Sequence, residues 1–234
     1  MKPNRSVIRL ISMDFGVYST KELLRRGSST WQIRRHTQTG VLVGLRRGWY
    51  ATATADPDVV AAVRAGGVLA CVSALRKHKL WVAPGYRQVH IRSTRDGELK
   101  SSQACTGLGR PSAALTAVDP IPVALLTAAK CMTAEHWIAA CDSALNTAGL
   151  TVSQMASEMG PSAGRISRLL AKCDPASQSG TESITRVRLR AVFDCSLRAG
   201  PYCELFARHV AAARPRSSLH RPRPIPALTG STVG

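Results

Sequence analysis

Acidic and aromatic residues are scarce in this sequence. Of its 234 residues, 14 are Asp or Glu and 32 are Lys or Arg, which gives a formal net charge of +18. Such an excess of positive charge attracts polyanions, although it carries no information about the fold. Most of the basic residues are arginines, which make forked contacts with phosphate and guanine. Because aromatic residues make up only 5% of the chain, the core has to be built from Val, Leu, Ile and Ala.

Long apolar runs are also missing. No stretch of 18 or more apolar residues occurs, so no membrane-spanning helix is expected. The opening stretch MKPNRSVIRLISMDF is not typical of a secretory signal, because Arg9 and Ser12 interrupt its apolar part and no small-residue cleavage site follows. We therefore expect a cytoplasmic protein with no membrane partner.

The cysteines lack the spacing of a metal site or a disulfide framework. There are 7 cysteines and no Cys-x-x-Cys pair, and the odd, irregular set favours buried free thiols. His78, His90 and His136 each lie in a different pattern with no second ligand at helical spacing. From the sequence we expect no bound metal and no cofactor.

Composition divides the chain into segments. Residues 1–54 are dense in positive charge, and their only acidic residues are Asp14 and Glu22. Residues 55–176 are rich in Ala and Leu and contain several amphipathic patterns. Residues 193–234 contain six arginines and five prolines without apolar periodicity, which is typical of a disordered basic tail.

The first segment has the order of a winged helix-turn-helix. SVIRLISMDF places apolar residues at helical spacing, and STKELLRRG and SSTWQIRRHTQTG each begin with a capping box and end at a glycine. VLVGLRRGWYA then reads as a two-stranded wing. The remaining patterns predict six or more helices with one or two short strands. The expected fold class is therefore mostly α with a small β wing, an α+β fold.

The third helix of this segment can be divided into faces. Ile33 is its one strongly apolar central residue, so it is expected to face the core with His36 and Thr37 on the same side. The outward residues and the wing arginines are of types that read bases or clamp phosphates. The predicted DNA-binding residues are Thr30, Trp31, Arg34, Arg35, Gln38, Arg46 and Arg47. Two alternatives stay open: these arginines only solvate a surface, or the helix is rotated and Trp31 lies in the core.

LLRRGSSTWQIRRHTQTGVLVGLRRGWYA resembles the N-terminal winged helix of AbiEi-family antitoxins of type IV toxin–antitoxin systems. AVRAGGVLACVSALRKHKLWV, WIAACDSAL and LLAKCDPASQSGTESITRVRLRAV are similar to an actinobacterial group of that family. The resemblance covers about residues 5–192. It implies a helical middle domain over residues 55–176. After that domain it implies an endonuclease domain similar to very-short-patch-repair nucleases, of the PD-(D/E)xK class.

Residues 177–192 match only the beginning of that endonuclease domain. Glu182 in GTESITRVRLR matches its first acidic residue, but the strands that should carry the remaining metal ligands do not follow. Asp194 and Glu204 are the only acids after Val192. We interpret residues 193–234 as out of register with an ancestral reading frame, which inspection of the other frames of the gene would test.

Three functions follow as hypotheses. The first is an antitoxin-like or transcriptional regulator that binds double-stranded DNA. The second is an endonuclease, inactive or incomplete, which would use Mg²⁺ and Glu182. The third is an interaction module whose helical middle binds a cognate toxin or a second copy of the chain. Oligomeric state and target sequence are left open.

Overall fold

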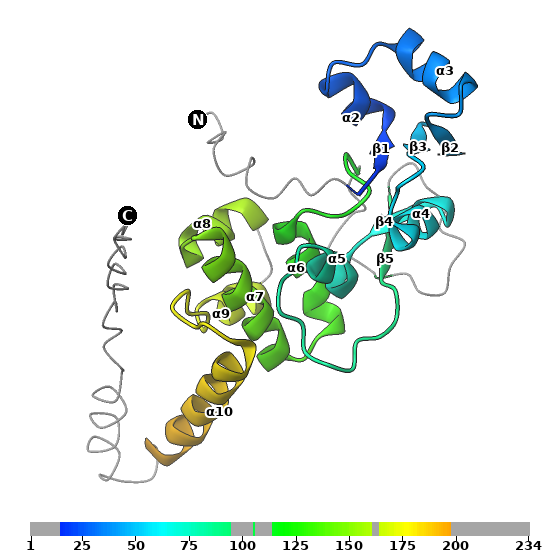
Figure 1. The fold of residues 1–234 in the computed structure, drawn as a ribbon. Coiled ribbons are helices and arrows are strands. Elements are labelled where there is room, and N and C mark those ends of the chain that lie inside the picture. Colours follow the sequence, from blue (N-terminus) through cyan, green and yellow to red (C-terminus); the bar gives the residue numbers. More distant parts are fainter. Residues whose placement is uncertain (1–14, 95–104, 106–113, 161–163, 198–234) are drawn as a thin grey trace, which may run out of the picture. The chain divides into compact units, whose positions relative to one another are not determined.

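The computed structural model describes residues 15–94, 105, 114–160 and 164–197 (Figure 1). Helices and two small antiparallel sheets make up this part of the chain, which confirms the expected α+β class. The helix predicted near residues 7–11 lies outside the described residues. So does the predicted tail from residue 198 onward.

The first sheet has three short strands, and two helices lie between its first and second strands along the chain. Its strand order is β1-β3-β2, with both pairings antiparallel. The elements are β1 (Val17–Ser19), α2 (Thr20–Arg25), α3 (Thr30–Gln38), β2 (Val43–Arg46) and β3 (Trp49–Ala51). Strand β1 was not predicted, because three residues ahead of a helix cap show no alternation that could be recognised.

Side-chain caps start both helices, but of the two predicted capping boxes only the one at α3 forms in full, because the Glu22 side chain of α2 pairs with Arg26. Ser19 Oγ accepts a hydrogen bond from the Glu22 amide at 3.1 Å. At α3, Ser29 Oγ accepts from the Gln32 amide at 3.1 Å, and Gln32 Oε1 accepts from the Ser29 amide at 2.7 Å. This reciprocal capping box satisfies two amides that have no partner inside the helix. It fixes where α3 begins and so which of its residues face outward.

A second sheet begins the middle of the chain. Helix α4 (Pro57–Arg64) leads into β4 (Gly67–Leu69), and α5 (Cys71–Lys77) is followed by β5 (Ile91–Ser93). A single helix was predicted from Val68 onward, and this was wrong for its first residues. Val68 and Leu69 pair instead with Arg92 and Ile91 of β5. The pairing partner lies more than twenty residues away, so the apolar run alone could not indicate a strand.

Five helices complete the described part: α6 (Ile121–Cys131), α7 (Ala134–Ala148), α8 (Val152–Met159), α9 (Gly164–Leu170) and α10 (Gly180–Leu197). Thr133 caps the start of α7, and Gly149 ends it with a left-handed φ of 62°, both as predicted. The main core joins buried apolar residues of α4 to α9 with Val17 of β1 and with Trp49 and Ala51 of β3. Its largest fully buried side chain is Trp137, whose Nε1–H donates to the Leu125 carbonyl at 2.7 Å.

The contacts of the chain divide it after Leu189, inside α10. A change in character was predicted at residue 193, but α10 continues through that position to Leu197.

Candidate nucleic-acid interface and cysteine–histidine group

The exposed face of α3 carries the predicted DNA-binding residues. Ile33 is 4% exposed and packs with Leu23 and Leu42 in a small separate core. Its burial fixes the rotation of the helix. The residues predicted to face outward are all exposed: Thr30, Trp31, Arg34, Arg35 and Gln38.

Trp31 is 62% exposed, so the alternative in which it enters the core is wrong. The Arg35 guanidinium lies 5.3 Å from the centre of the Trp31 ring. A cation over an indole face at this distance is attracted by the ring. The outer face of the helix therefore carries an indole ring with a guanidinium stacked over it.

His36 and Thr37 are exposed although they follow Ile33 at helical spacing. The Thr37 hydroxyl donates to the Ile33 carbonyl at 2.9 Å, so its side chain folds back on the helix. The buried stripe of α3 is therefore as narrow as a single residue. A helix held by one buried side chain leaves most of its surface for a partner.

Charge in residues 15–54 is almost entirely of one sign. The acidic residue of this stretch, Glu22, forms an ion pair of 2.9 Å with Arg26 of its own helix. No acidic residue occurs in α3 or in the hairpin of β2 and β3. The positive potential of Arg34, Arg35 and Arg47 is therefore not balanced by a carboxylate on their own elements.

The two arginines of the hairpin differ in placement. Arg47 is exposed in the turn, which Gly48 closes with a φ of 76°. Arg46 is half-buried, lies 5.3 Å over the Trp49 ring and donates to the Gly67 carbonyl at 3.3 Å. Arg47 is thus the exposed arginine of the hairpin. Arg46 contacts the protein itself.

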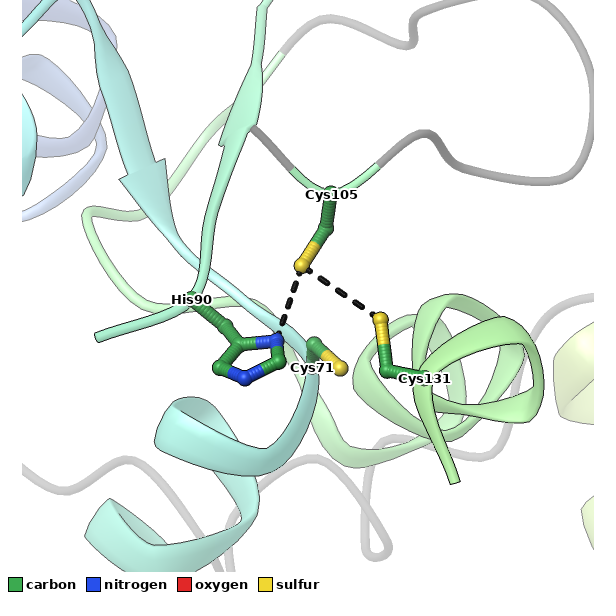
Figure 2. A group of neighbouring side chains, drawn as sticks. All are labelled: Cys71, His90, Cys105 and Cys131. Atoms are coloured by element: carbon green, nitrogen blue, oxygen red, sulfur yellow. Dashed lines mark hydrogen bonds between the residues drawn. The ribbon is translucent and has the colours of Figure 1, made fainter. Parts of the chain in front are cut away.

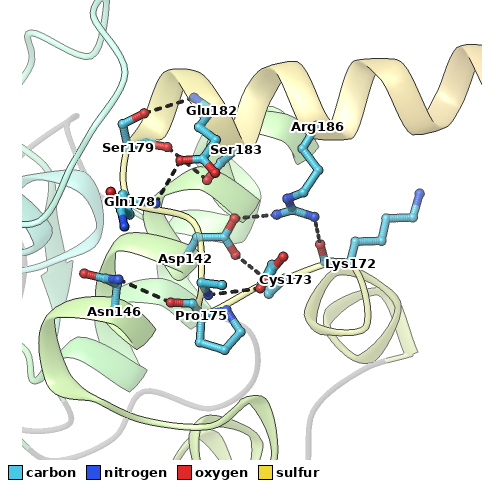
Figure 3. Close-up of polar contacts among 12 residues, drawn as sticks. Asp142, Asn146, Lys172, Cys173, Pro175, Gln178, Ser179, Glu182, Ser183 and Arg186 are labelled. Atoms are coloured by element: carbon cyan, nitrogen blue, oxygen red, sulfur yellow. Dashed lines mark hydrogen bonds and ion pairs between the residues drawn. The ribbon is translucent and has the colours of Figure 1, made fainter. Parts of the chain in front are cut away.

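Glu182, the residue matched to a nuclease carboxylate, lies at the start of α10 (Figure 3). Its Oε2 accepts from the Gln178 amide at 3.0 Å, and its own amide donates to Ser179 Oγ at 3.2 Å. These contacts are those of a helix cap. The side chain of Asp194 and all of Glu204 lie outside the described residues, so their part of the nuclease hypothesis has no structural counterpart.

A buried carboxylate anchors α10 to α7 nearby. Asp142 Oδ2 lies 2.5 Å from Arg186 Nη2, and Asp142 Oδ1 accepts from the Asp174 amide at 2.7 Å (Figure 3). Arg186 also donates to the Lys172 carbonyl at 2.7 Å. Both oxygens of Asp142 are thus used by the protein, which accounts for its burial at 1% exposure.

Four residues from distant parts of the middle segment come together in one group (Figure 2). They are Cys71 at the start of α5, His90 just before β5, Cys105 in a loop, and Cys131 at the end of α6. Their Sγ and ring-nitrogen atoms all lie within 4.8 Å of one another. Among the described residues, this is the one group of three or more His, Cys, Asp or Glu arranged to hold a metal ion.

The thiols of this group differ in their acidity. A hydrogen bond with Cys71, reinforced by His90 against the effect of burial, lowers the pKa of Cys105 to about 5. The same hydrogen bond, together with burial, raises the pKa of Cys71. Burial also raises the pKa of Cys131.

Sequence reasoning missed this group because it looked for ligands close together along the chain. The four residues extend from position 71 to position 131, and no two follow a short Cys-x-x-Cys spacing. The available signal was weaker: Cys71 and His90 flank β4 and β5, the two elements that pair. A correct strand assignment at residues 67–69 would have placed them on neighbouring strand ends.

No described helix is long and apolar enough to cross a membrane. Comparison with known proteins gives no matching family model, no matching curated protein and no matching solved structure. The similarity to AbiEi antitoxins therefore stays a prediction from the motifs.

Proposed function

We propose that this protein binds double-stranded DNA, with residues 15–54 acting as a winged helix-turn-helix. The observation that carries the proposal is the exposed face of α3, where Arg34, Arg35 and Gln38 project from a helix whose rotation is fixed by Ile33. Side chains of these types on one helical face suit base edges and phosphates in a major groove.

The order of elements supports the same proposal. Strand β1 precedes two helices, and a hairpin of β2 and β3 follows them and pairs back on β1. In this arrangement α3 would lie in the groove and the turn at Arg47 would reach the flanking backbone. The net charge of +18 would add attraction that does not depend on base sequence.

As a regulator, the protein would act at an operator, in line with the predicted antitoxin resemblance. A cognate toxin remains a proposed partner of the helical middle. The nuclease function has less support, because Glu182 serves as a helix cap.

Fluorescence anisotropy of a labelled duplex, titrated across salt concentration, tests the proposal on the full chain. The test variant is Arg34→Ala/Arg35→Ala. The control variant is Arg165→Ala/Arg168→Ala, which removes the same charge from exposed positions on α9. Each base-reading arginine is expected to contribute about 1–3 kcal/mol, whereas a lost phosphate contact lowers the salt slope by about 1.

We expect the α3 variant to lose affinity strongly and the α9 variant to change it little. Arg47→Ala should weaken binding to all duplexes alike and reduce the salt slope. Equal losses in the α3 and α9 variants would mean that overall charge explains binding, and α3 would not be the recognition helix.

A further inference from the structure

We propose that Cys71, His90, Cys105 and Cys131 bind one zinc ion in a closed structural site. This inference is independent of DNA binding, because it concerns the middle of the chain and not α3 or the hairpin. The donor set of three thiols and one imidazole is among those that hold structural zinc in proteins.

The distances within the group fit a tetrahedral centre. Zinc–sulfur bonds of about 2.3 Å place two sulfur ligands about 3.8 Å apart. Cys105 Sγ lies 3.7 Å from Cys131 Sγ and 3.0 Å from His90 Nδ1. Cys71 completes the set from the side of α5 (Figure 2). Each residue directs one donor atom to a common centre, and the side chains need only small adjustments to close around an ion.

The backbone positions three of the four ligands through short hydrogen bonds. The Ala70 amide donates to the His90 carbonyl at 2.9 Å, beside Cys71. The His90 amide donates to Ser73 Oγ at 2.9 Å, and the Cys105 amide donates to the Ile91 carbonyl at 2.7 Å. These bonds hold the backbone of His90, of Cys105 and of the residue before Cys71, so the ligand side chains start from fixed positions.

The site would be structural and not catalytic. Four protein ligands complete a tetrahedral zinc shell, so no position is left for water or substrate. Cys71 is fully buried and has a left-handed φ of 53°, which is uncommon for a residue other than glycine. Zinc would tie the start of α5, the edge of β5 and the end of α6 to the segment that contains Cys105.

A disulfide between Cys105 and Cys131 is the competing use of the same atoms. A disulfide would not explain why the donor atoms of His90 and Cys71 also lie within 4.8 Å of the two sulfur atoms. It would also require an oxidant, which the zinc site does not. The two states can be distinguished, because a disulfide removes two titratable thiols and binds no metal.

Metal analysis and cobalt spectroscopy on the full chain test the proposal. The protein is purified with a reductant and without chelator, and its zinc content is measured by mass spectrometry. Zinc is then exchanged for Co²⁺, whose thiolate charge-transfer and tetrahedral d–d absorption report the ligands. Cys105→Ala is the test variant. Cys141→Ala is the matched control, because Cys141 is a fully buried thiol in α7 outside the group. His90→Cys exchanges one ligand for another of a zinc-binding type.

We expect one zinc per chain in the wild type and in Cys141→Ala, and its loss in Cys105→Ala. His90→Cys should retain the metal and show stronger thiolate–cobalt absorption, which a merely structural effect of the substitution would not produce. A chelator should lower the melting temperature of the wild type. Wild-type protein that contains no zinc and gives no thiolate–cobalt absorption would overturn the proposal, as would equal metal contents in Cys105→Ala and Cys141→Ala.

Discussion

Arg92 and Asp119 form a bidentate ion pair in the interior, and its energetic role can be tested directly. Arg92 Nε lies 2.6 Å from Asp119 Oδ2, and Nη2 lies 2.6 Å from Oδ1. The two side chains are only 9% and 1% exposed. The pair connects β5 to the residues just before α6, and the Asp119 amide donates to the Leu69 carbonyl of β4. Strands β4 and β5 are therefore both joined to Asp119, β5 through its carboxylate and β4 through its amide.

The expected change in the free energy of unfolding depends on whether one partner of the ion pair is removed or both are replaced by apolar residues. Burial raises the pKa of Asp119 in spite of the neighbouring Arg92 guanidinium. Asp119→Asn would leave the guanidinium buried without its counter-charge, at a cost of about 3–5 kcal/mol in the free energy of unfolding. Arg92→Met/Asp119→Leu removes both charges and retains volume, so its stability should lie within about 1 kcal/mol of the wild type or above it.

Urea unfolding followed by far-UV circular dichroism at neutral pH measures these differences, with the slope of the transition checked for each variant. We expect Asp119→Asn to be much less stable than both the wild type and the double variant. If the double variant is as unstable as the single one, the ion pair itself provides the stability, and the reasoning from desolvation is refuted.

Two further predictions concern single residues. Burial lowers the pKa of His78, whose Nε2–H donates to the Asp119 carbonyl at 2.8 Å. A base with a lowered folded pKa stabilises the fold above its unfolded pKa of about 6.5 and loses that contribution as the pH falls. Urea unfolding at pH 7 and pH 5 should therefore show a larger loss for the wild type than for His78→Gln, and equal losses would contradict the assignment. Glu182→Ala should lower stability by about 0.5–1 kcal/mol, because it removes the carboxylate that accepts from the Gln178 amide at the start of α10, and Glu182→Gln should restore most of this loss. Loss of a Mg²⁺-dependent cleavage activity in both variants would instead favour the nuclease hypothesis.

Local signals in the sequence predicted much of this fold. Helix ends are marked by residues that act on their close neighbours in the chain. They are Ser29 and Gln32 at the start of α3, Asp56 and Pro57 at the start of α4, and Thr133 and Gly149 at the two ends of α7. Such contacts form wherever the chain is helical, so they can be recognised without tertiary structure. Ile33, the strongly apolar residue in the middle of α3, indicated the buried side correctly, whereas the exposure of Trp31, His36 and Thr37 was decided by the structure.

Pairings between distant segments could not be predicted in this way. Strand β4 is an apolar run that a helix could equally contain, and its partner β5 decides the outcome. The cysteine–histidine group depends on that pairing and on the packing of α6 against α5. Spacing rules for zinc sites describe ligands supplied by short loops, whereas here each ligand comes from a different element.

The two proposed sites belong to different cores, which bears on how they influence each other. α3 is attached through the small core of Leu23, Ile33 and Leu42, whereas the cysteine–histidine group lies within the large core of α4 to α9. Residues 15–54 nevertheless contact the second region: Val17, Trp49 and Ala51 belong to the large core, and Ser19 Oγ donates to the Leu115 carbonyl at 2.8 Å. Leu115 precedes α6, the helix that ends at Cys131. Loss of zinc should therefore reach residues 15–54 through the position of β1, and it should change the stability of these residues more than the chemistry of the exposed face of α3.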